Sequence, residues 1–273
     1  MNGFGDELLD YITAGPKLRK WYGEGERMPV DGGGEDMTSE PENDDLEDDG
    51  VRDAVLVVDA DSATAEQVVL QLILSRAKVR ALVKNAAAAS TAYGSYITPV
   101  EGSSGDARAV QAALRGLRAV ICTGRLGEVL PLCQQRKVEH LILLTSTGGT
   151  GGGAFSLGAF LDGEATAQRD SAREAAALRS GVPCTLLRVG RISDGPGGSE
   201  RLAVSQDDLL GRPLGEISRE DVARVLVRCL DRQPAGSLSF SMEAAGPAEG
   251  DSDLDLAEQL ARLQESVPAA NVT

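Results

Sequence analysis

The sequence predicts an α/β fold built as a doubly wound parallel sheet in a single domain. Short apolar, β-branched runs recur along the chain, beginning with residues 54–58, and a stretch able to form a helix follows most of them. Turn residues separate each run from its helix. This alternation is typical of a parallel sheet with helices on both faces. We predict the strand order 3-2-1-4-5-6, with Val55 to Val58 in the centre of the sheet.

The stretch from Ala54 to Lys84 has the pattern of an opening βαβ unit. An apolar pentad is followed by a tight polar turn and then by a thirteen-residue run that can form an apolar helix. Asp61, Ser62 or Thr64 is expected to cap this helix, and Thr64 has the spacing of a capping box with Gln67. The predicted boundaries are 54–58 for the first strand, 64–76 for the helix and 78–84 for the second strand.

The later elements continue the alternation. Asp106 is placed to cap the helix that runs to Arg115. Residues 164–180 predict one long Ala-rich helix, which the Gly-Val-Pro sequence after Ser180 ends. Five glycines between Gly148 and Gly153 predict a flexible loop over the crevice beside the first and fourth strands, where a ligand should bind. The other predicted strands are 95–100, 119–122, 139–145 and 237–242, and the other predicted helices are 85–92, 127–136 and 254–263.

Composition divides the chain into four parts. The formal net charge is −15, but ten acidic residues and no Lys or Arg lie between Asp31 and Asp49, which leaves a charge of −5 elsewhere. Such a tract is typical of a disordered linker. The mild charge of the remainder argues against nucleic acid as a principal partner. We predict an aromatic and basic N-terminal segment (1–30), an acidic disordered linker (31–50), a folded domain (51–245) and a C-terminal helix and tail (246–273).

The N-terminal segment is expected to contact a protein partner, together with the surface of the folded domain. It places Trp21 and Tyr22 beside the bases Lys17, Arg19 and Lys20. The alternative is that these two aromatic rings pack against the chain's own domain. No apolar run has membrane-spanning length, and no Arg-rich leader opens the chain. We therefore expect no transmembrane segment, and a targeting peptide that was either removed or never present.

The titratable residues argue against a metal site. His140 is the only histidine, so a His-based metal cage or a Ser-His-Asp triad would depend on one residue. The cysteines have no Cys-x-x-Cys spacing, and they are expected to be buried apolar residues in a reducing compartment. We expect no metal. The four cysteines are Cys122, Cys133, Cys184 and Cys229.

Three segments resemble the atypical short-chain dehydrogenase/reductases, the extended, NmrA-like Rossmann proteins that bind NAD(P). The first is the βαβ unit at 54–84. Ser-Gly-Val-Pro-Cys-Thr-Leu-Leu-Arg-Val-Gly at 180–190 is similar to the family segment that closes a helix and forms strand six. Ile-Ser-Arg-Glu-Asp-Val-Ala at 217–223 is similar to a downstream helix start. The resemblance covers roughly residues 51–242. Residues 15–23 also resemble a group of plant and algal plastid proteins, which implies the chloroplast stroma.

The resemblance implies an NAD(P) site, but the glycine turn of the family is absent. The glycines of Gly-Ala-Thr-Gly-x-x-Gly fall on Asp59, Ser62 and Ala65. Asp59 and Asp61 are expected to bring carboxylates to the phosphate position, where a like-charge pair at about 4 Å costs on the order of 4 kcal/mol. We therefore expect NADP binding to be weak or lost.

Other residues at family positions are expected to carry any residual affinity for NADP. Lys84 ends the second strand where the family often has an Arg for the 2′-phosphate, which favours NADP over NAD. Thr123 and Gly124 resemble the small-residue turn under the cofactor, and Arg188 stands where the family braces the loop over it. Gly102 and Ser103 replace the Gly-Asp pair that usually closes strand three.

The resemblance also implies a catalytic Ser and a Tyr-Lys pair. Ser146 stands at the Ser position, but the Tyr and Lys positions fall on Thr166 and Asp170. Arg169 or Arg173 could supply charge, although a guanidinium does not titrate near neutral pH. Two functions stay open. We favour a non-catalytic assembly, scaffold or regulatory protein of the plastid, and the alternative is an unconventional NADP(H)-dependent reductase or isomerase that lacks the Tyr-Lys pair.

Overall fold

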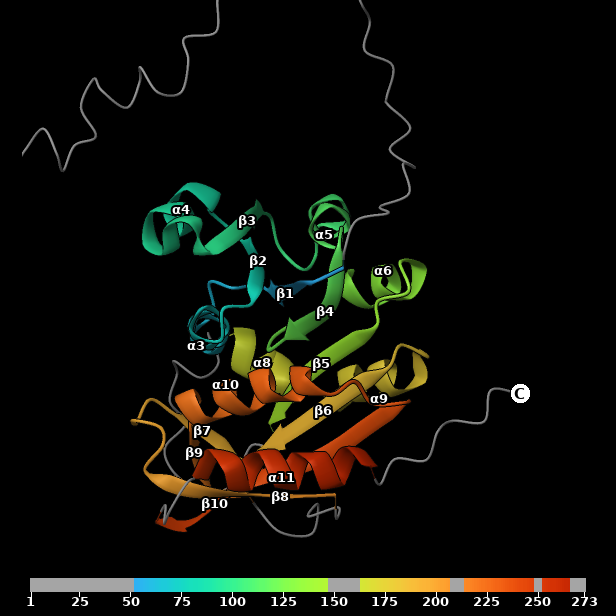
Figure 1. Cartoon of the computed structure of the whole chain (residues 1–273). Helices are drawn as coiled ribbons and strands as arrows, with labels where there is room; N and C mark the ends of the chain where they lie inside the picture. The colour runs from blue at the N-terminus through green and yellow to red at the C-terminus, as the bar shows by residue number, and fades with distance from the viewer. Residues whose placement is uncertain (1–51, 147–162, 207–213, 248–251, 266–273) are drawn as a thin grey trace, which may run out of the picture. The chain divides into compact units, whose positions relative to one another are not determined.

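The central feature is a sheet in which a parallel Rossmann arrangement is extended at one edge (Figure 1). The computed structural model describes residues 52–146, 163–206, 214–247 and 252–265. Its main sheet has eight strands in the order β3-β2-β1-β4-β5-β6-β10-β8, which confirms the predicted order of the first six. These strands are β1 (Ala54–Val58), β2 (Lys78–Val83), β3 (Ile97–Glu101), β4 (Leu117–Cys122), β5 (His140–Ser146), β6 (Cys184–Val189), β8 (Glu200–Ser205) and β10 (Ser237–Pro247).

Strand β1 lies inside the sheet and separates two hydrophobic cores. It pairs in parallel with β2 on one side and β4 on the other. Val55 and Val57 belong to one core, whereas Leu56 and Val58 belong to the other. Successive side chains of a strand point to opposite faces, so this strand is apolar throughout because both of its faces are covered.

Helices cover both faces of the sheet, as predicted. The core on the Val55 face includes residues of α3 (Ala63–Leu74), α4 (Ala86–Tyr93), α10 (Arg219–Arg228) and α11 (Ser252–Glu265). The core on the Leu56 face includes residues of α5 (Ala107–Ala113), α6 (Val129–Gln135) and α9 (Ser171–Arg179). The short η1 (Gly94–Tyr96) and η3 (Cys229–Asp231) complete the connections.

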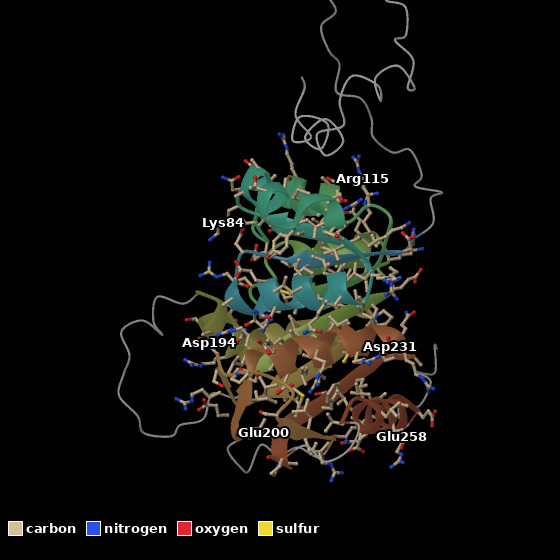
Figure 2. The ribbon with its side chains drawn as sticks, turned by 60° about the vertical axis from the view of Figure 1, so that its left-hand side comes forward. Lys84, Arg115, Asp194, Glu200, Asp231 and Glu258 are labelled. Atoms are coloured by element: carbon tan, nitrogen blue, oxygen red, sulfur yellow. The ribbon has the colours of Figure 1, made fainter. Side chains whose placement is uncertain are left out.

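The far edge of the sheet differs from the sequence prediction. The predicted last strand, 237–242, continues to Pro247, pairs in parallel with β6 and carries β8 antiparallel on its other side. Helix α11 packs over β8, where the Gln259 side chain accepts from the Val204 backbone N–H and donates to the Leu202 carbonyl. Figure 2 shows Glu200 and Glu258 at this end of the domain and Lys84 toward the opposite end. A second sheet pairs β7 (Arg191–Ser193) with β9 (Glu216–Ser218).

Helix α3 begins without the predicted capping box. Ser62 is its N-cap residue, and the Ser62 side chain makes no capping hydrogen bond. Thr64 lies inside the first turn, so it cannot act as a cap for Gln67. The Asp61 carboxylate accepts instead from the backbone N–H of Lys84. The capping prediction for Asp106 is confirmed, because its carboxylate accepts from two backbone N–H groups of α5.

The predicted long helix 164–180 is wrong, because the chain forms two helices there. Helix α8 (Gly163–Gln168) ends two residues before Asp170. Asp170 is the N-cap of α9, where its carboxylate accepts from the Ala172 N–H at 2.9 Å. An aspartate at this position competes with the helical ladder for backbone N–H groups, and the Ala-rich pattern does not reveal that competition.

The cysteines and the histidine are structural in the part of the chain described. All four cysteines are free and buried. His140 is the first residue of β5, where its Nε2 lies 2.8 Å from the Thr185 hydroxyl. Within the described ranges, no group of three His, Cys, Asp or Glu could hold a metal ion, and no helix is long and apolar enough to cross a membrane. The predictions for 1–30, 31–50 and the glycine loop at 148–153 lie outside the described residues.

Candidate functional site

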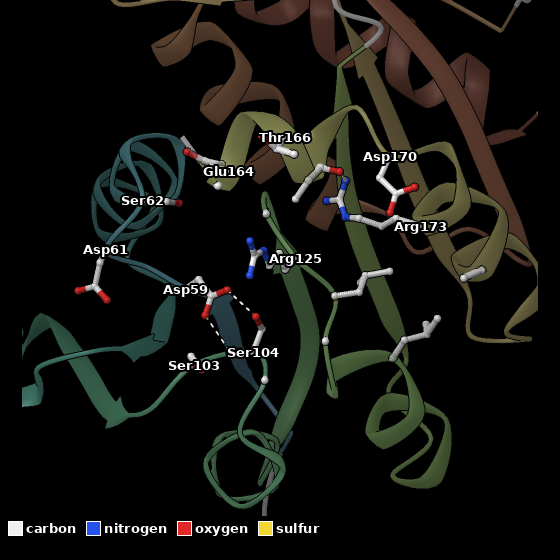
Figure 3. A pocket seen from close by; sticks show the side chains of 18 of the residues that line it. Asp59, Asp61, Ser62, Ser103, Ser104, Arg125, Glu164, Thr166, Asp170 and Arg173 are labelled. Carbon is white, nitrogen blue, oxygen red and sulfur yellow. Dashed lines mark hydrogen bonds between the residues drawn. The ribbon is translucent and has the colours of Figure 1, made fainter. Parts of the chain in front are cut away.

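A large cleft lies at the carboxyl ends of β1, β2 and β4, where an open α/β sheet binds its ligands (Figure 3). Its volume is about 1230 Å³. Turns of the sheet form one side, and α8 and α9 contribute the other. The charged residues of the lining are Asp59, Asp61, Lys84, Arg125, Glu164, Asp170 and Arg173.

Asp59 takes the place of the first family glycine and also its backbone conformation. Its φ of 48° lies in the left-handed region, which costs a non-glycine residue about 1 kcal/mol or more. The Asp59 carboxylate accepts two hydrogen bonds from Ser104, one from the backbone N–H at 2.8 Å and one from the hydroxyl at 2.6 Å. These bonds hold the turn after β1 to the loop after β3.

The two carboxylates of this turn do not converge as the sequence analysis expected. The Asp61 carboxylate accepts from the Lys84 backbone N–H at 2.6 Å, and in Figure 3 it projects away from Asp59. Each carboxylate therefore has its own backbone N–H donor. The repulsion expected between them is relieved by this divergence. Asp59 remains the nearer of the two to the middle of the cleft in Figure 3.

The N-terminus of α3 is occupied by the chain itself. The Glu164 carboxylate on α8 accepts from the Thr64 backbone N–H at 3.4 Å. A Cβ on Gly124 would lie 4.0 Å from Cγ of Glu164, so this side chain passes between the turns after β1 and β4. On the other side, the Arg219 guanidinium donates to the Thr64 hydroxyl at 2.6 Å. Ala65, at the third glycine position, is fully buried against the core.

The turn after β4 brings a basic side chain into the cleft. Thr123 is fully buried beneath the surface, Gly124 lines the cleft, and Arg125 projects into it (Figure 3). Cys122 ends the strand, and its thiol donates to the Arg125 carbonyl at 3.2 Å. Burial raises the pKa of the Cys122 thiol, so this group stays protonated and is a poor nucleophile.

The inner end of the cleft holds the two positions at which the family has its Tyr and Lys. Thr166 and Asp170 both line the cleft, but they lie on different helices, with Asp170 serving as the N-cap of α9. Arg173 is only 6% exposed at this end. Its guanidinium donates to the carbonyls of Leu144 at 2.9 Å, Ala167 at 3.3 Å and Cys122 at 3.4 Å.

Four predicted site residues lie outside the cleft lining: Ala65 and Thr123, which are fully buried, and Ser146 and Arg188. Ser146 donates its hydroxyl proton to the Gly190 carbonyl at 2.8 Å. Arg188 forms a half-buried ion pair with Glu174 of α9, with Nε 3.0 Å from the carboxylate. The structure therefore brings together Asp59, Ser62, Lys84, Gly124, Thr166 and Asp170, and it places Ser146, Ala65, Thr123 and Arg188 around them.

Sequence reasoning missed three of the residues that shape the cleft. Ser104 binds Asp59, Glu164 reaches the first turn of α3, and Arg125 projects into the space between them. The distance along the chain between Glu164 and Thr64 is 100 residues, and no local pattern signals such a contact. Arg125 follows a Thr-Gly turn at a strand end, which is the one signal that could have identified it.

The size of this cleft suits a dinucleotide, but the charges in the middle of the cleft do not. The volume and the position of Lys84 at the end of β2 suit an adenosine phosphate. At the N-terminus of α3, however, a pyrophosphate would compete with the Glu164 carboxylate for the Thr64 N–H and would also approach Asp59. In this arrangement, the phosphate position is negatively charged by the protein's own side chains.

The sheet order and the cleft define a Rossmann-type nucleotide-binding protein. The chain belongs to the NAD(P)H-binding family, whose model matches residues 60–233. It is 31% identical over 119 residues to sanguinarine reductase of Eschscholzia californica, a match that covers 43% of each chain. The chain thus matches less than half the length of that relative.

Solved structures show the same fold at low sequence identity. An anaerobillin reductase of Escherichia coli is 19% identical, with a TM-score of 0.58, covering 72% of this chain and 100% of that one. A wide-type short-chain dehydrogenase/reductase of Veillonella parvula in complex with NADP is 13% identical, with a TM-score of 0.54, covering 72% of this chain and 97% of that one. These similarities extend to the fold alone.

Proposed function

We propose that this chain is a non-catalytic member of the NAD(P)H-binding family, which serves as an assembly, scaffold or regulatory protein in the plastid. The observation that carries the proposal is the absence of a Tyr-Lys pair from the described lining of the cleft. Thr166 and Asp170 stand at those positions, and Lys84 is at the opposite end, directly after β2. A phenol activated by an adjacent ammonium is what the standard mechanism requires.

The charge around the phosphate position supports the same proposal. Asp59 and Glu164 both present carboxylates where a dinucleotide would place its pyrophosphate. Weak or lost NADP binding follows, because like charges within a few ångströms repel by several kcal/mol at a protein surface. A Rossmann domain keeps its shape even when it binds its cofactor weakly and transfers no hydride. A partner protein can recognise that shape. The expected partner contacts are the N-terminal segment, at 1–30, and the surface of the domain.

The second candidate is an unconventional NADP(H)-dependent reductase or isomerase. It is favoured by the sequence similarity to sanguinarine reductase and by a cleft large enough for a cofactor and a substrate. Without a tyrosine, the proton would have to come from Asp170 or from solvent. The Asp170 carboxylate is already engaged in the structure, because it caps α9 by accepting from the Ala172 N–H at 2.9 Å.

Turnover measurements separate the two functions. Purified protein and NADPH are incubated with a broad panel of carbonyl and enone compounds, and absorbance of the reduced nicotinamide is followed. We expect no rate above a blank that lacks protein. Hydride transfer that is lost on Ser146→Ala or Arg169→Gln would establish the second candidate and overturn the first.

A further inference from the structure

The carboxylates and the arginines that line the cleft differ in their interactions with the rest of the chain. Each of the four carboxylates accepts at least one hydrogen bond from an N–H group of the chain. Neither of the two arginines forms an ion pair with a carboxylate within the ranges that the structure describes. The carboxylate contacts are Asp59 with Ser104, Asp61 with Lys84, Glu164 with Thr64 and Asp170 with Ala172.

Arg173 is a buried cation whose donors are incompletely used. Its guanidinium has five N–H groups, and the three partners described above are all neutral backbone carbonyls. Its Nε has no hydrogen-bond partner among the described residues. Burying a guanidinium without a counter-ion costs several kcal/mol, and a bound anion would recover much of this free energy. Arg173 also lines the cleft, so an anion in the cleft can approach it.

Arg125 offers a second guanidinium to the same space. Its side chain projects into the cleft in Figure 3 and, as far as the described residues go, makes no hydrogen bond or ion pair. The neighbouring lining is apolar, with Leu130, Pro131 and Ala176 on the side of α6 and α9. An apolar wall with a few convergent donors is typical of a small-molecule site.

We propose that the inner half of the cleft binds a small organic anion, whose carboxylate or phosphate group accepts hydrogen bonds from Arg125 and Arg173. The apolar wall contacts the carbon skeleton of this ligand. The inference goes beyond the proposed function, because a non-catalytic scaffold requires no small ligand at Arg125 and Arg173. The anion is either part of the dinucleotide or a separate effector or substrate.

Calorimetric titration of the full-length protein tests the site with three probes: succinate, inorganic pyrophosphate and NADPH. We expect saturable binding of succinate or pyrophosphate that weakens as salt is added. Arg125→Gln should weaken it about tenfold, which is the effect of one charge-assisted hydrogen bond. Arg108→Gln is the matched control, because Arg108 is exposed on α5 and lies outside the cleft lining.

Arg173 is tested with Arg173→Lys, which keeps the positive charge but cannot donate to three carbonyls and a ligand at once.

A cooperative thermal transition confirms that each variant is folded. If NADPH displaces the small anion, the site serves the phosphates of the dinucleotide; if both bind together, the site serves a separate molecule. Absence of saturable binding by both small anions, or equal weakening by Arg125→Gln and Arg108→Gln, would overturn the proposal.

Discussion

The Glu164 carboxylate lies 3.4 Å from the backbone nitrogen of Thr64, so a side chain of α8 occupies the N-terminus of α3. In Rossmann proteins, this helix end attracts the pyrophosphate of the cofactor, because its N–H groups are unpaired and the helix dipole is positive there. Here a carboxylate of the chain supplies the negative charge. The same contact ties α8 to the first βαβ unit.

Glu164→Gln is expected to increase the affinity for NADP(H) by about tenfold. The substitution keeps the size of the side chain but removes the charge that opposes a pyrophosphate at this helix end. Calorimetric titration with NADPH measures the change. Glu66→Gln is the control. Glu66 is an exposed residue in the first turn of α3, so this variant also removes a negative charge near that helix end, but from a side chain outside the cleft lining. Equal NADPH affinities of the wild type and Glu164→Gln would show that the Glu164 carboxylate does not oppose phosphate binding.

Restoring the glycine turn should also restore cofactor binding. In the variant Asp59→Gly/Asp61→Thr/Ser62→Gly, we expect NADPH affinity to rise at least tenfold, since the carboxylate nearest the phosphate position is gone. Asp61→Thr alone should change affinity little, because the Asp61 carboxylate is bound to the Lys84 N–H and projects away from Asp59. Low-micromolar binding by the unmodified protein would refute the idea that this turn has lost its function.

Two ion pairs of unequal burial predict unequal effects on stability. Arg188 and Glu174 are 16% and 19% exposed, whereas Arg191 and Glu216 are 74% and 45% exposed. Glu174→Gln should lower the free energy of unfolding by about 1–3 kcal/mol, because it removes the negative charge from an ion pair that is mostly shielded from solvent. Glu216→Gln should change it by less than about 0.5 kcal/mol, since exposed pairs contribute little. Urea denaturation of both variants measures the difference, and similar losses would contradict the burial argument.

His140 predicts a loss of stability in mild acid. Burial, aided by the charge of Arg118, lowers the pKa of His140 from 6.5 to about 4. The unfolded chain therefore binds the proton more tightly, so the contribution of His140 is complete above pH 6.5 and is lost as the pH falls toward 4. The full contribution is about 3 kcal/mol.

This dependence is measured as the free energy of unfolding between pH 7 and pH 4, for the wild type and for His140→Gln. The variant keeps a side chain that can hydrogen-bond to the Thr185 hydroxyl but cannot titrate. We expect its stability to fall less steeply over this interval, while the carboxylates contribute equally to both proteins. Parallel curves would mean that His140 is not neutral in the folded state.

The sequence was sufficient for the strand order from β3 to β6, because that order follows from local signals. The uninterrupted apolar run at 54–58 indicates a strand covered on both faces, and each following helix forces a parallel crossover. The cap at Asp106 was predictable for the same reason, since its partners are the next few backbone N–H groups. The capping box at Thr64 failed because the Thr64 N–H and hydroxyl bind residues far away in the sequence.

The extension of the sheet and the contents of the cleft were decided by the tertiary structure. Strand β8, with the sequence Glu-Arg-Leu-Ala-Val-Ser, is only half apolar, and it is an edge strand because it pairs with the open side of β10 and α11 packs over it. The helix break at Asp170 turned α9 so that Arg173 reaches the carbonyls of Leu144 and Cys122.

The sequence by itself determined that the glycine turn is acidic and that the Tyr-Lys pair is absent, because both are facts of residue type at positions fixed by local pattern. It could not determine which carboxylates face the phosphate position. Asp61 turns to Lys84, and Glu164 enters from a helix 100 residues away. The direction of a charged side chain depends on which backbone N–H groups lie within its reach, and the packing of distant elements brings those groups together.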